Sequence, residues 1–393
     1  MDERGNGMVT LYRNARLIDA AGDRYGDLWV RDGVIAACAQ LGRQRADRVV
    51  DMRGNALMPA FIDLHCHLRD PGYPEKETME TGMRAALKGG YAHLVAMANT
   101  EPVIATPALV LANHEKAERL RLCRLTQAAA AGEALGDERP SDRAALSRVT
   151  RVLSNDGRTI LSDVFMRQLL LDSRRYGFLI STHCQPEREI VARDIRLLRE
   201  AGGSLHVGHI SRAETVELIR RAKAKGLRLT CEVTPHHLFG WDSGYRVNPP
   251  LRTRADVEAL IAGIRDGTID CLATDHAPHT PQDKADGAAG ISGIEHAFQI
   301  CLQVFTEHGI PLTRLSEMLS HAPARRLGLR AGLLRPGYAA DIAALALGEE
   351  SEIDAGAMVS RSHNTPFHGR SVRGRVLRTV VGGETRYEYG KTV

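Results

Sequence analysis

The sequence predicts an α/β fold, in which a (β/α)8 TIM-like barrel carries a small β domain made from both ends of the chain. Apolar β-type runs alternate with helix-periodic segments through the middle of the chain, and 393 residues can hold a barrel and a smaller unit. Residues near both termini read as short strands between Gly and Asp turns. We expect residues 1–57 and 330–393 to form the β domain and residues 58–329 to form the barrel.

The two ends of the chain share one strand-and-turn pattern. The N-terminal runs are MVTLYRNARLI, DLWVRDGVIAA and ADRVVDM, and the C-terminal runs are ADIAALAL and GRVLRTVVGGETRYEYG. Neither end holds enough apolar residues to fold comfortably alone. We therefore expect the two ends to pair in space.

The middle of the chain supplies the barrel elements. LISTHC, SLHVGHI, RLTCEVT and DCLATDH read as buried strands, whereas ETVELIRRAKAKG and ADVEALIAGIRDG have helical periodicity. Gly226 stands near the end of the first of these helices, where glycine is common. The Ala- and Gly-rich stretch at 127–142 is compatible with a surface helix, a loop or a shortened element.

Composition excludes several classes of protein. The net charge of +4 comes without a block of consecutive Lys or Arg, which argues against a nucleic-acid-binding face. No run of eighteen apolar residues predicts a transmembrane helix, and the first thirty residues lack the apolar core of a signal peptide. The seven cysteines are scattered and lack CxxC spacing, which favours reduced thiols and a cytoplasmic protein.

The stretch FIDLHCH (61–67) ends an apolar run with two histidines one residue apart. Side chains at i and i+2 of a strand point to the same face, so His65 and His67 can approach one cation. In a barrel, catalytic groups lie at the carboxyl ends of the strands. The pair therefore predicts half of a metal site there.

Similar side chains end several later runs. These are Asp156, His183, His209 and Asp275. Imidazoles and carboxylates are ligands that suit Zn²⁺, and four histidines with two carboxylates are enough for two ions that share one carboxylate. His206 precedes His209 by three residues and is expected to point away from it on a regular strand, so it is not included.

Longer motifs connect these residues to a known family. They are HCHLRDPGYPEKETMETGMRAALKGGY, MANTEP, NDG, HVGHIS, EVTPHHL, VNPPLR, ATDHAPHT and TPFHGRSVRGRV. In order and kind they resemble the dihydroorotases of the amidohydrolase superfamily in their long, type I form, over nearly the whole chain. Hydantoinases and allantoinases share the paired histidines, but the Arg-acid-Pro-Gly continuation and DHAPH favour dihydroorotase.

The resemblance implies a (β/α)8 barrel with a small β-sandwich domain and a zinc centre at the barrel mouth. His65 and His67 would hold one ion, touched also by Asp275, and His183 and His209 would hold the second. Relatives bridge the ions with a carbamylated lysine or an aspartate. No lysine stands near that strand end, and NDG resembles the DDG of the aspartate form, so Asp156 is chosen, with Asn155 as the alternative.

The resemblance also implies the substrate contacts, which are Arg69, Asn99, Asn248 and His279. A planar guanidinium binds a carboxylate through two parallel hydrogen bonds, which suits Arg69 to the carboxylate of dihydroorotate. The alternative for Arg69 is an internal salt bridge with Asp70 or Glu77. Ala98 replaces the family's usual proline, and the segment between about 104 and 150 is short.

The activity implied is the reversible, zinc-dependent hydrolysis of (S)-dihydroorotate to N-carbamoyl-L-aspartate in pyrimidine (UMP) biosynthesis, with Asp275 as the proton carrier. Two alternatives remain. One is another cyclic amide hydrolase, such as a hydantoinase or allantoinase. The other is a non-catalytic scaffold for aspartate carbamoyltransferase, although such chains typically lose metal-binding histidines. The expected partners are the small-molecule substrate, a second copy in a homodimer and possible aspartate carbamoyltransferase.

Overall fold

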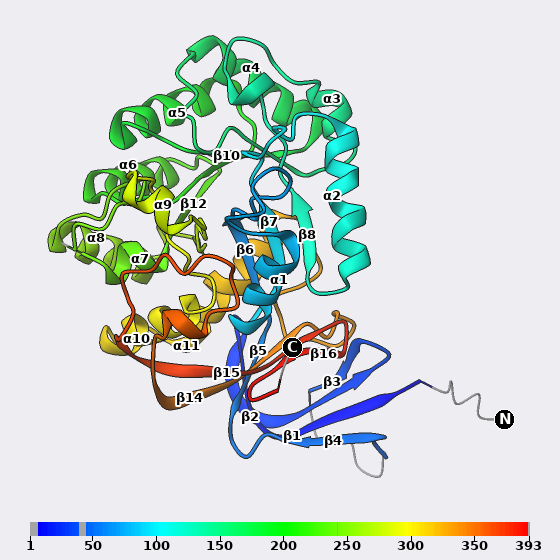
Figure 1. Cartoon of the computed structure of the whole chain (residues 1–393). Coiled ribbons are helices and arrows are strands. Elements are labelled where there is room, and N and C mark those ends of the chain that lie inside the picture. Colours follow the sequence, from blue (N-terminus) through cyan, green and yellow to red (C-terminus); the bar gives the residue numbers. More distant parts are fainter. Residues whose placement is uncertain (1–6, 39–44, 242, 392–393) are drawn as a thin grey trace.

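A computed structural model describes residues 7–38, 45–241 and 243–391 (Figure 1). Residues 1–6 and 39–44 of the expected β domain, and residues 392–393 at its other end, lie outside the described residues. The elements form an α/β structure with parallel strands in the middle of the chain and a mostly antiparallel sheet made from its ends.

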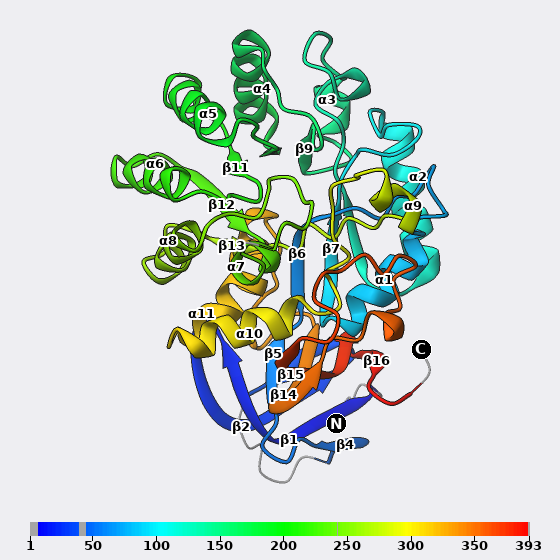
Figure 2. The ribbon, with the colours of Figure 1, turned by 60° about the vertical axis from the view of Figure 1, so that its left-hand side comes forward.

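Strands from both ends of the chain lie in one eight-stranded sheet. The N-terminal strands are β1 (Val9–Asp19), β2 (Gly22–Arg31), β3 (Val34–Ala37), β4 (Arg48–Asp51) and β5 (Ala56–Pro59), and the C-terminal strands are β14 (Ile342–Glu352), β15 (Ser371–Val381) and β16 (Glu384–Glu388). Their order is β16-β15-β14-β5-β1-β2-β3, with β4 beside β1. β5 pairs antiparallel with β14, which joins the two ends (Figures 1 and 2).

The described residues in the middle of the chain include eight short parallel strands. β6 (Phe61–Cys66), β7 (Tyr91–Ala96) and β8 (Arg124–Gln127) form one sheet, and β9 (Val152–Ser154), β10 (Leu179–Thr182), β11 (Leu205–Val207), β12 (Leu229–Val233) and β13 (Cys271–Leu272) form another. Isolated parallel bridges connect the sheets on both sides, from Ala129 to Leu153 and from Cys66 to His276. Because parallel strands need crossover connections, helices separate them.

The helices follow the strands in sequence. They are α1 (Met79–Lys88), α2 (Pro107–Leu120), α3 (Arg143–Leu146), α4 (Asp163–Tyr176), α5 (Glu187–Ala201), α6 (Ala213–Ala224), α7 (Pro235–Phe239), α8 (Arg254–Arg265), α9 (Pro281–Ala285), α10 (Ala297–Glu307), α11 (Leu312–Ser316) and α12 (Ala322–Arg326). Figure 2 shows α4, α5, α6 and α8 around the outside of the parallel strands. No helix among the described residues has the length and apolar content needed to cross a membrane.

The two predicted helices are confirmed, and their ends have local causes. Thr253 caps α8 because its hydroxyl accepts a hydrogen bond from the backbone N–H of Asp256. α6 ends just before Gly226, which takes a φ of 80° that a residue with a Cβ adopts at a cost.

The stretch at 127–142 is mainly a loop after the end of β8, and not a surface helix. Ala128–Ala131 are fully buried after β8, a single 3-10 turn follows at Glu133–Leu135, and α3 has four residues. This segment lies against β9 and the residues after it, because Ala129 bridges Leu153 and the N–H groups of Ala131 and Gly132 donate to Asn155, next to Asp156.

Candidate metal centre and active site

β6 delivers the first pair of histidines. The strand is buried along its whole length because its apolar side chains pack in the core, and His65 and His67 stand at and just beyond its carboxyl end. His65 Nε2 lies 3.2 Å from Asp156 Oδ1, and His67 Nε2 lies 3.4 Å from Asp156 Oδ2. The two imidazoles therefore face the same carboxylate, as the HxH spacing predicts.

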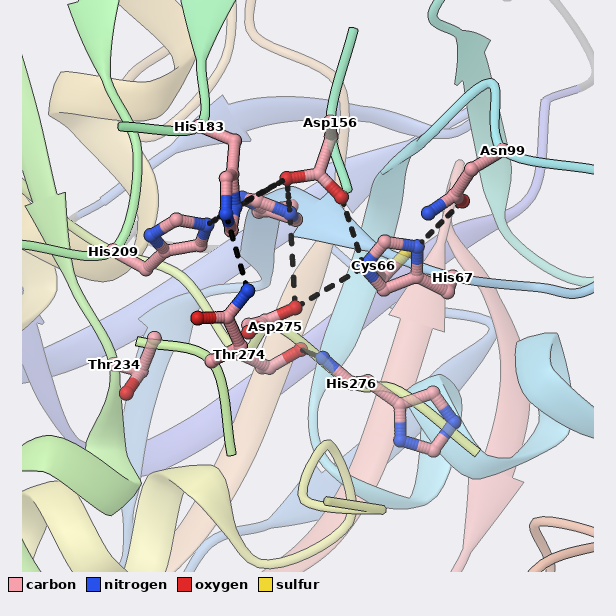
Figure 3. Close-up of polar contacts among 12 residues, drawn as sticks. Cys66, His67, Asn99, Asp156, His183, His209, Thr234, Thr274, Asp275 and His276 are labelled. Atoms are coloured by element: carbon pink, nitrogen blue, oxygen red, sulfur yellow. Dashed lines mark hydrogen bonds and ion pairs between the residues drawn. The ribbon is translucent and has the colours of Figure 1, made fainter. Parts of the chain in front are cut away.

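The second pair comes from the ends of β10 and β11. His183 Nδ1 and His209 Nε2 are 3.0 Å apart, and each lies 3.6 Å from Asp156 Oδ1. Figure 3 shows His183, His209 and His67 gathered around Asp156. Four histidines from three separate parts of the sequence thus meet at one carboxylate.

Asp156, and not Asn155, occupies this central place. Asn155 Oδ1 accepts hydrogen bonds from the backbone N–H groups of Ala131 and Gly132, and its Nδ2 donates to the carbonyl of Gly136. The amide of Asn155 is thereby used to hold the 131–136 segment. The carboxylate of the next residue is left to face the four imidazoles.

Asp275 completes the cluster from the segment after β13. Its Oδ1 lies 3.1 Å from His67 Nε2 and 3.7 Å from His65 Nε2. Asp275, His209 and Arg69 all take positive φ, at 45°, 29° and 55°. Such backbone is costly for residues with a Cβ and concentrates at functional sites, where the surrounding structure enforces it.

The donor atoms fit a divalent metal ion. His65, His67 and Asp156 form one group and Asp156, His183 and His209 another, each with its ligand atoms within 4.8 Å of one another. His65 Nε2 and Asp156 Oδ1 are buried and lack a hydrogen-bond partner although they face each other. Imidazole nitrogen and carboxylate oxygen are the ligands that transition-metal cations prefer.

The charges of the cluster favour a cation at its centre. Burial opposes a charge on His65, yet Asp156, Glu232 and Asp275 outweigh burial and raise the pKa of His65 well above its usual value. Burial likewise opposes ionisation of Asp156, but His65, His183 and His209 lower the pKa of this carboxyl well below its usual value. The pocket therefore holds ionised carboxylates that attract positive charge.

Arg69 lies beside the metal cluster and is not paired with an acid. Its Nε donates to the carbonyl of Pro278 at 3.2 Å, and its Nη2 lies 3.2 Å from His279 Nε2. No carboxylate within the described part of the chain lies at ion-pair distance from this guanidinium. Asp70 binds Lys116 at 2.7 Å instead, which contradicts the salt-bridge alternative with Asp70.

The other acid considered for Arg69 is also engaged elsewhere. Glu77 accepts hydrogen bonds from the hydroxyl of Ser360 and the backbone N–H of Arg361. Burial, followed by the charge of Arg69, lowers the pKa of His279 to about 3. The site therefore presents an unpaired guanidinium next to a neutral imidazole.

The two predicted amide contacts lie against metal-cluster histidines. Asn99 Oδ1 accepts from His67 Nδ1 at 2.9 Å, and Asn248 Nδ2 lies 3.2 Å from His183 Nε2. Figure 3 shows Asn99 on the outer side of His67. Asn99 and Asn248 thus join the network of the metal cluster, whereas Arg69 and His279 form a separate pair.

Sequence reasoning missed two members of this network, Glu232 and His206. Glu232 is fully buried on β12, with Oε1 2.9 Å from His65 Nδ1 and Oε2 2.9 Å from His206 Nε2. Burial would raise the pKa of Glu232, but His206 and His65 lower it to about 2. The available signal was an acidic residue inside the apolar run RLTCEVT, since buried charges need partners.

Comparison with known proteins agrees with this arrangement. Residues 56–386 match the Amidohydrolase family. A dihydroorotase from Anaeromyxobacter dehalogenans (strain 2CP-C) is 39% identical over 430 aligned residues, which cover 98% of this chain and 99% of the relative. A dihydroorotase from Clostridium botulinum (strain Eklund 17B / Type B) is 35% identical over 402 residues, covering 97% and 100%.

Solved structures with the same fold have other names. The L-hydantoinase (dihydropyrimidinase) from Arthrobacter aurescens superposes with a TM-score of 0.90 at 24% identity, covering 98% of this chain and 97% of the other. A D-hydantoinase from Bacillus sp. AR9 gives 0.85 at 21% identity, covering 98% and 96%. At these identities the likeness concerns the fold alone. The family match and the relatives above 30% identity along nearly the whole sequence show that this chain belongs to the amidohydrolase superfamily and, within it, to the dihydroorotase family.

Proposed function

We propose that the protein is a dihydroorotase that reversibly hydrolyses (S)-dihydroorotate to N-carbamoyl-L-aspartate, a step of pyrimidine biosynthesis. The observation that carries this proposal is the unpaired guanidinium of Arg69 beside the cluster of four histidines and two aspartates. The substrate unites a cyclic amide with a carboxylate, and the site unites a metal cluster with a group that binds carboxylates. The names of the relatives support the same reaction.

We propose that β6–β13 are the strands of the (β/α)8 barrel. The isolated parallel bridges on both sides of the two parallel sheets support closure, since they connect β6 to the segment after β13 and the segment after β8 to β9. Residues 1–57 and 330–393 would be the β-sandwich domain, which the shared sheet of the two chain ends supports. Each predicted ligand would then follow a strand at the carboxyl-end face of the barrel.

In this proposal zinc is the cofactor and two ions bind. His65, His67 and Asp275 would hold one ion, His183 and His209 the other, and Asp156 would serve both, since it belongs to both groups of ligand atoms. Bound divalent cations would polarise the ring carbonyl and make water acidic enough to react near neutral pH.

Asp275 is the proposed proton carrier. Burial opposes its ionisation, but His67, His65 and His209 lower its pKa, so the carboxylate is ionised and ready to accept a proton at neutral pH. It would take the proton of the attacking water and give it to the ring nitrogen, which is a poor leaving group as an anion. In the reverse direction the same carboxyl group would take the proton from the nitrogen that closes the ring.

The remaining residues would orient the substrate. Arg69 would bind its carboxylate, with His279 beside the guanidinium as a neutral hydrogen-bonding partner. Asn99 and Asn248 would reach the ring from the two sides of the metal cluster while each keeps its contact with a histidine. Holding the ring between these groups fixes its carbonyl relative to the reacting water.

The test compares substrates and metal states. Chelated protein is reloaded with zinc and assayed with dihydroorotate, hydantoin and allantoin. We expect turnover of dihydroorotate that is lost on chelation and restored by zinc. Preference for hydantoin or allantoin would support the rival hydrolases, and a chain that binds no metal and turns over none of the three would support the carbamoyltransferase scaffold.

The assembly state is a separate proposal. We propose a homodimer and possible association with aspartate carbamoyltransferase, both from the family resemblance. Light scattering gives the molar mass of the protein alone, which tests the homodimer, and of its mixture with aspartate carbamoyltransferase, which tests the association.

A further inference from the structure

Glu232 is a buried carboxylate that the proposed reaction does not use. It stands on β12, is 0% exposed, and divides its two oxygens between two imidazoles, those of His65 and His206, at 2.9 Å each. An ionised carboxylate in the protein interior is costly unless each oxygen has a donor. Here both donors are histidines, and one of them belongs to the metal cluster.

The contacts decide which nitrogens carry hydrogen. An ionised carboxylate can only accept, so His65 presents an N–H at Nδ1 and His206 presents one at Nε2. Nδ1 of His206 is then free to accept from the hydroxyl of Thr230, which lies 2.8 Å away. β11 pairs with β12 so that His206 and Thr230 are direct neighbours, and the sheet itself holds this chain of hydrogen bonds.

The consequence for His65 is a fixed orientation. With Nδ1–H held by Glu232, Nε2 faces Asp156 at 3.2 Å, inside the cluster, and is the nitrogen that a cation can bind once it displaces the proton there. The opposite tautomer would turn an N–H toward the cation and prevent binding. Outer partners of this kind fix the ring and strengthen metal binding in known metal sites.

We propose that Glu232 is a positioning residue for the cation at the His65–His67–Asp156 group, and that His206 holds Glu232 in place. The inference rests on the proposed function only in requiring that a divalent cation occupies this group. The negative charge of Glu232 also adds to the attraction for that cation.

The test measures zinc affinity and not activity alone. Metal-free, full-length protein is titrated with zinc against a competing chelator dye, and the data are fitted with two sites. Glu232→Gln keeps one acceptor but turns an NH₂ group toward one of the two histidines. We expect one site to weaken by roughly 10–100-fold while the other holds. Two unchanged affinities would overturn the inference.

A matched control separates orientation from folding. Glu295 is equally buried, accepts from the backbone N–H groups of Val359 and Ser360, and pairs with Lys88 away from the cluster. Glu295→Gln is expected to lower the melting temperature and leave both zinc affinities unchanged. An equal loss of affinity in both variants would assign the effect to stability and overturn the inference.

A second pair of variants tests the same inference without changing Glu232, in case Glu232→Gln does not fold. His206→Gln keeps an N–H donor for Glu232 and should bind zinc nearly as the parent does, whereas His206→Leu should weaken one site. Equal affinities in these two variants would overturn the inference. Dihydroorotate turnover by the parent is measured separately, and its absence would contradict the proposed function while leaving the zinc comparison valid.

Discussion

The two halves of the metal cluster share Asp156 but differ in what stands behind their imidazoles. Behind His65 and His67 are oxygen acceptors, Glu232 and Asn99, each 2.9 Å from an Nδ1. His183 has the amide nitrogen of Asn248 at 3.2 Å from its outer nitrogen, and its inner nitrogen lies 3.0 Å from His209.

The first half of the cluster, His65 and His67, is therefore better ordered to bind a cation than the second half, His183 and His209. Acceptors behind His65 and His67 hold the Nδ1–H groups outward, so that Nε2 of each ring faces the carboxylates inside the cluster. His183 and His209 face each other at hydrogen-bond distance, so one of them must donate to the other until a cation replaces that contact. The first half is organised in advance, and the second half is completed by its ligand.

The largest effect is expected for the carboxylate that both halves share. Asp156→Ala should release zinc from both halves and lower kcat by roughly a thousandfold or more, because the metal supplies several kcal/mol of stabilisation. Elemental analysis and steady-state kinetics measure this. Asn155→Asp is the neighbouring control and should keep the zinc content, and a single zinc held normally by Asp156→Ala would break the idea of a shared carboxylate.

A smaller loss is expected when only the proton carrier changes. Asp275→Asn should lower kcat by roughly 10²–10⁴-fold, since the amide cannot accept the proton of the attacking water. Most of the zinc should remain because the histidines and Asp156 are intact. Normal turnover would remove Asp275 from this role, and complete loss of zinc would make it chiefly a ligand of the first half.

Binding of the substrate carboxylate is expected to depend on Arg69, which lies on the same side of the cluster as His67. Arg69→Met should raise KM for dihydroorotate by roughly 10–100-fold, which corresponds to a lost charge-assisted hydrogen-bond pair. Arg124→Met is the matched control, because Arg124 pairs with Asp341 away from the site. An unchanged KM in Arg69→Met would count against carboxylate binding by this residue.

The smallest effect concerns pH. Despite burial, nearby carboxylates raise the pKa of His65 in the first half and of His209 in the second, so each is protonated more readily than a free imidazole in the metal-free protein. Zinc must displace these protons, and its affinity should fall as pH is lowered, by roughly tenfold per pH unit for each proton displaced. Calorimetry of zinc binding in buffers of different ionisation enthalpy counts the protons that are released. Release of one proton would show that only one half of the cluster is protonated before zinc binds.

The six residues chosen from the sequence meet in the structure because they follow strands, and parallel strands bring their carboxyl ends together. Sequence reasoning chose Asp156 but left Asn155 as the alternative. The choice depends on the backbone N–H groups of Ala131 and Gly132, which come from a separate segment and capture the amide of Asn155. Residue order alone does not reveal such a contact between segments.

The same limit explains why His206 was set aside. Alternation along a strand predicts that residues three apart point in opposite directions. β11 ends at Val207, and His209 takes a φ of 29°, so alternation does not continue to it. His206 is not among the ligand groups of the cluster, and it reaches His65 only through Glu232, which lies on another strand.

The position of β5 between β1 and β14 has a consequence for synthesis of the protein. The ribosome makes β1–β5 first and β14 more than 280 residues later, after all the parallel strands. Until then the nascent chain carries an unpaired strand edge next to β6, and such edges invite wrong pairing. A chain truncated before Ile342 should therefore aggregate even though every residue of the metal cluster has already been made.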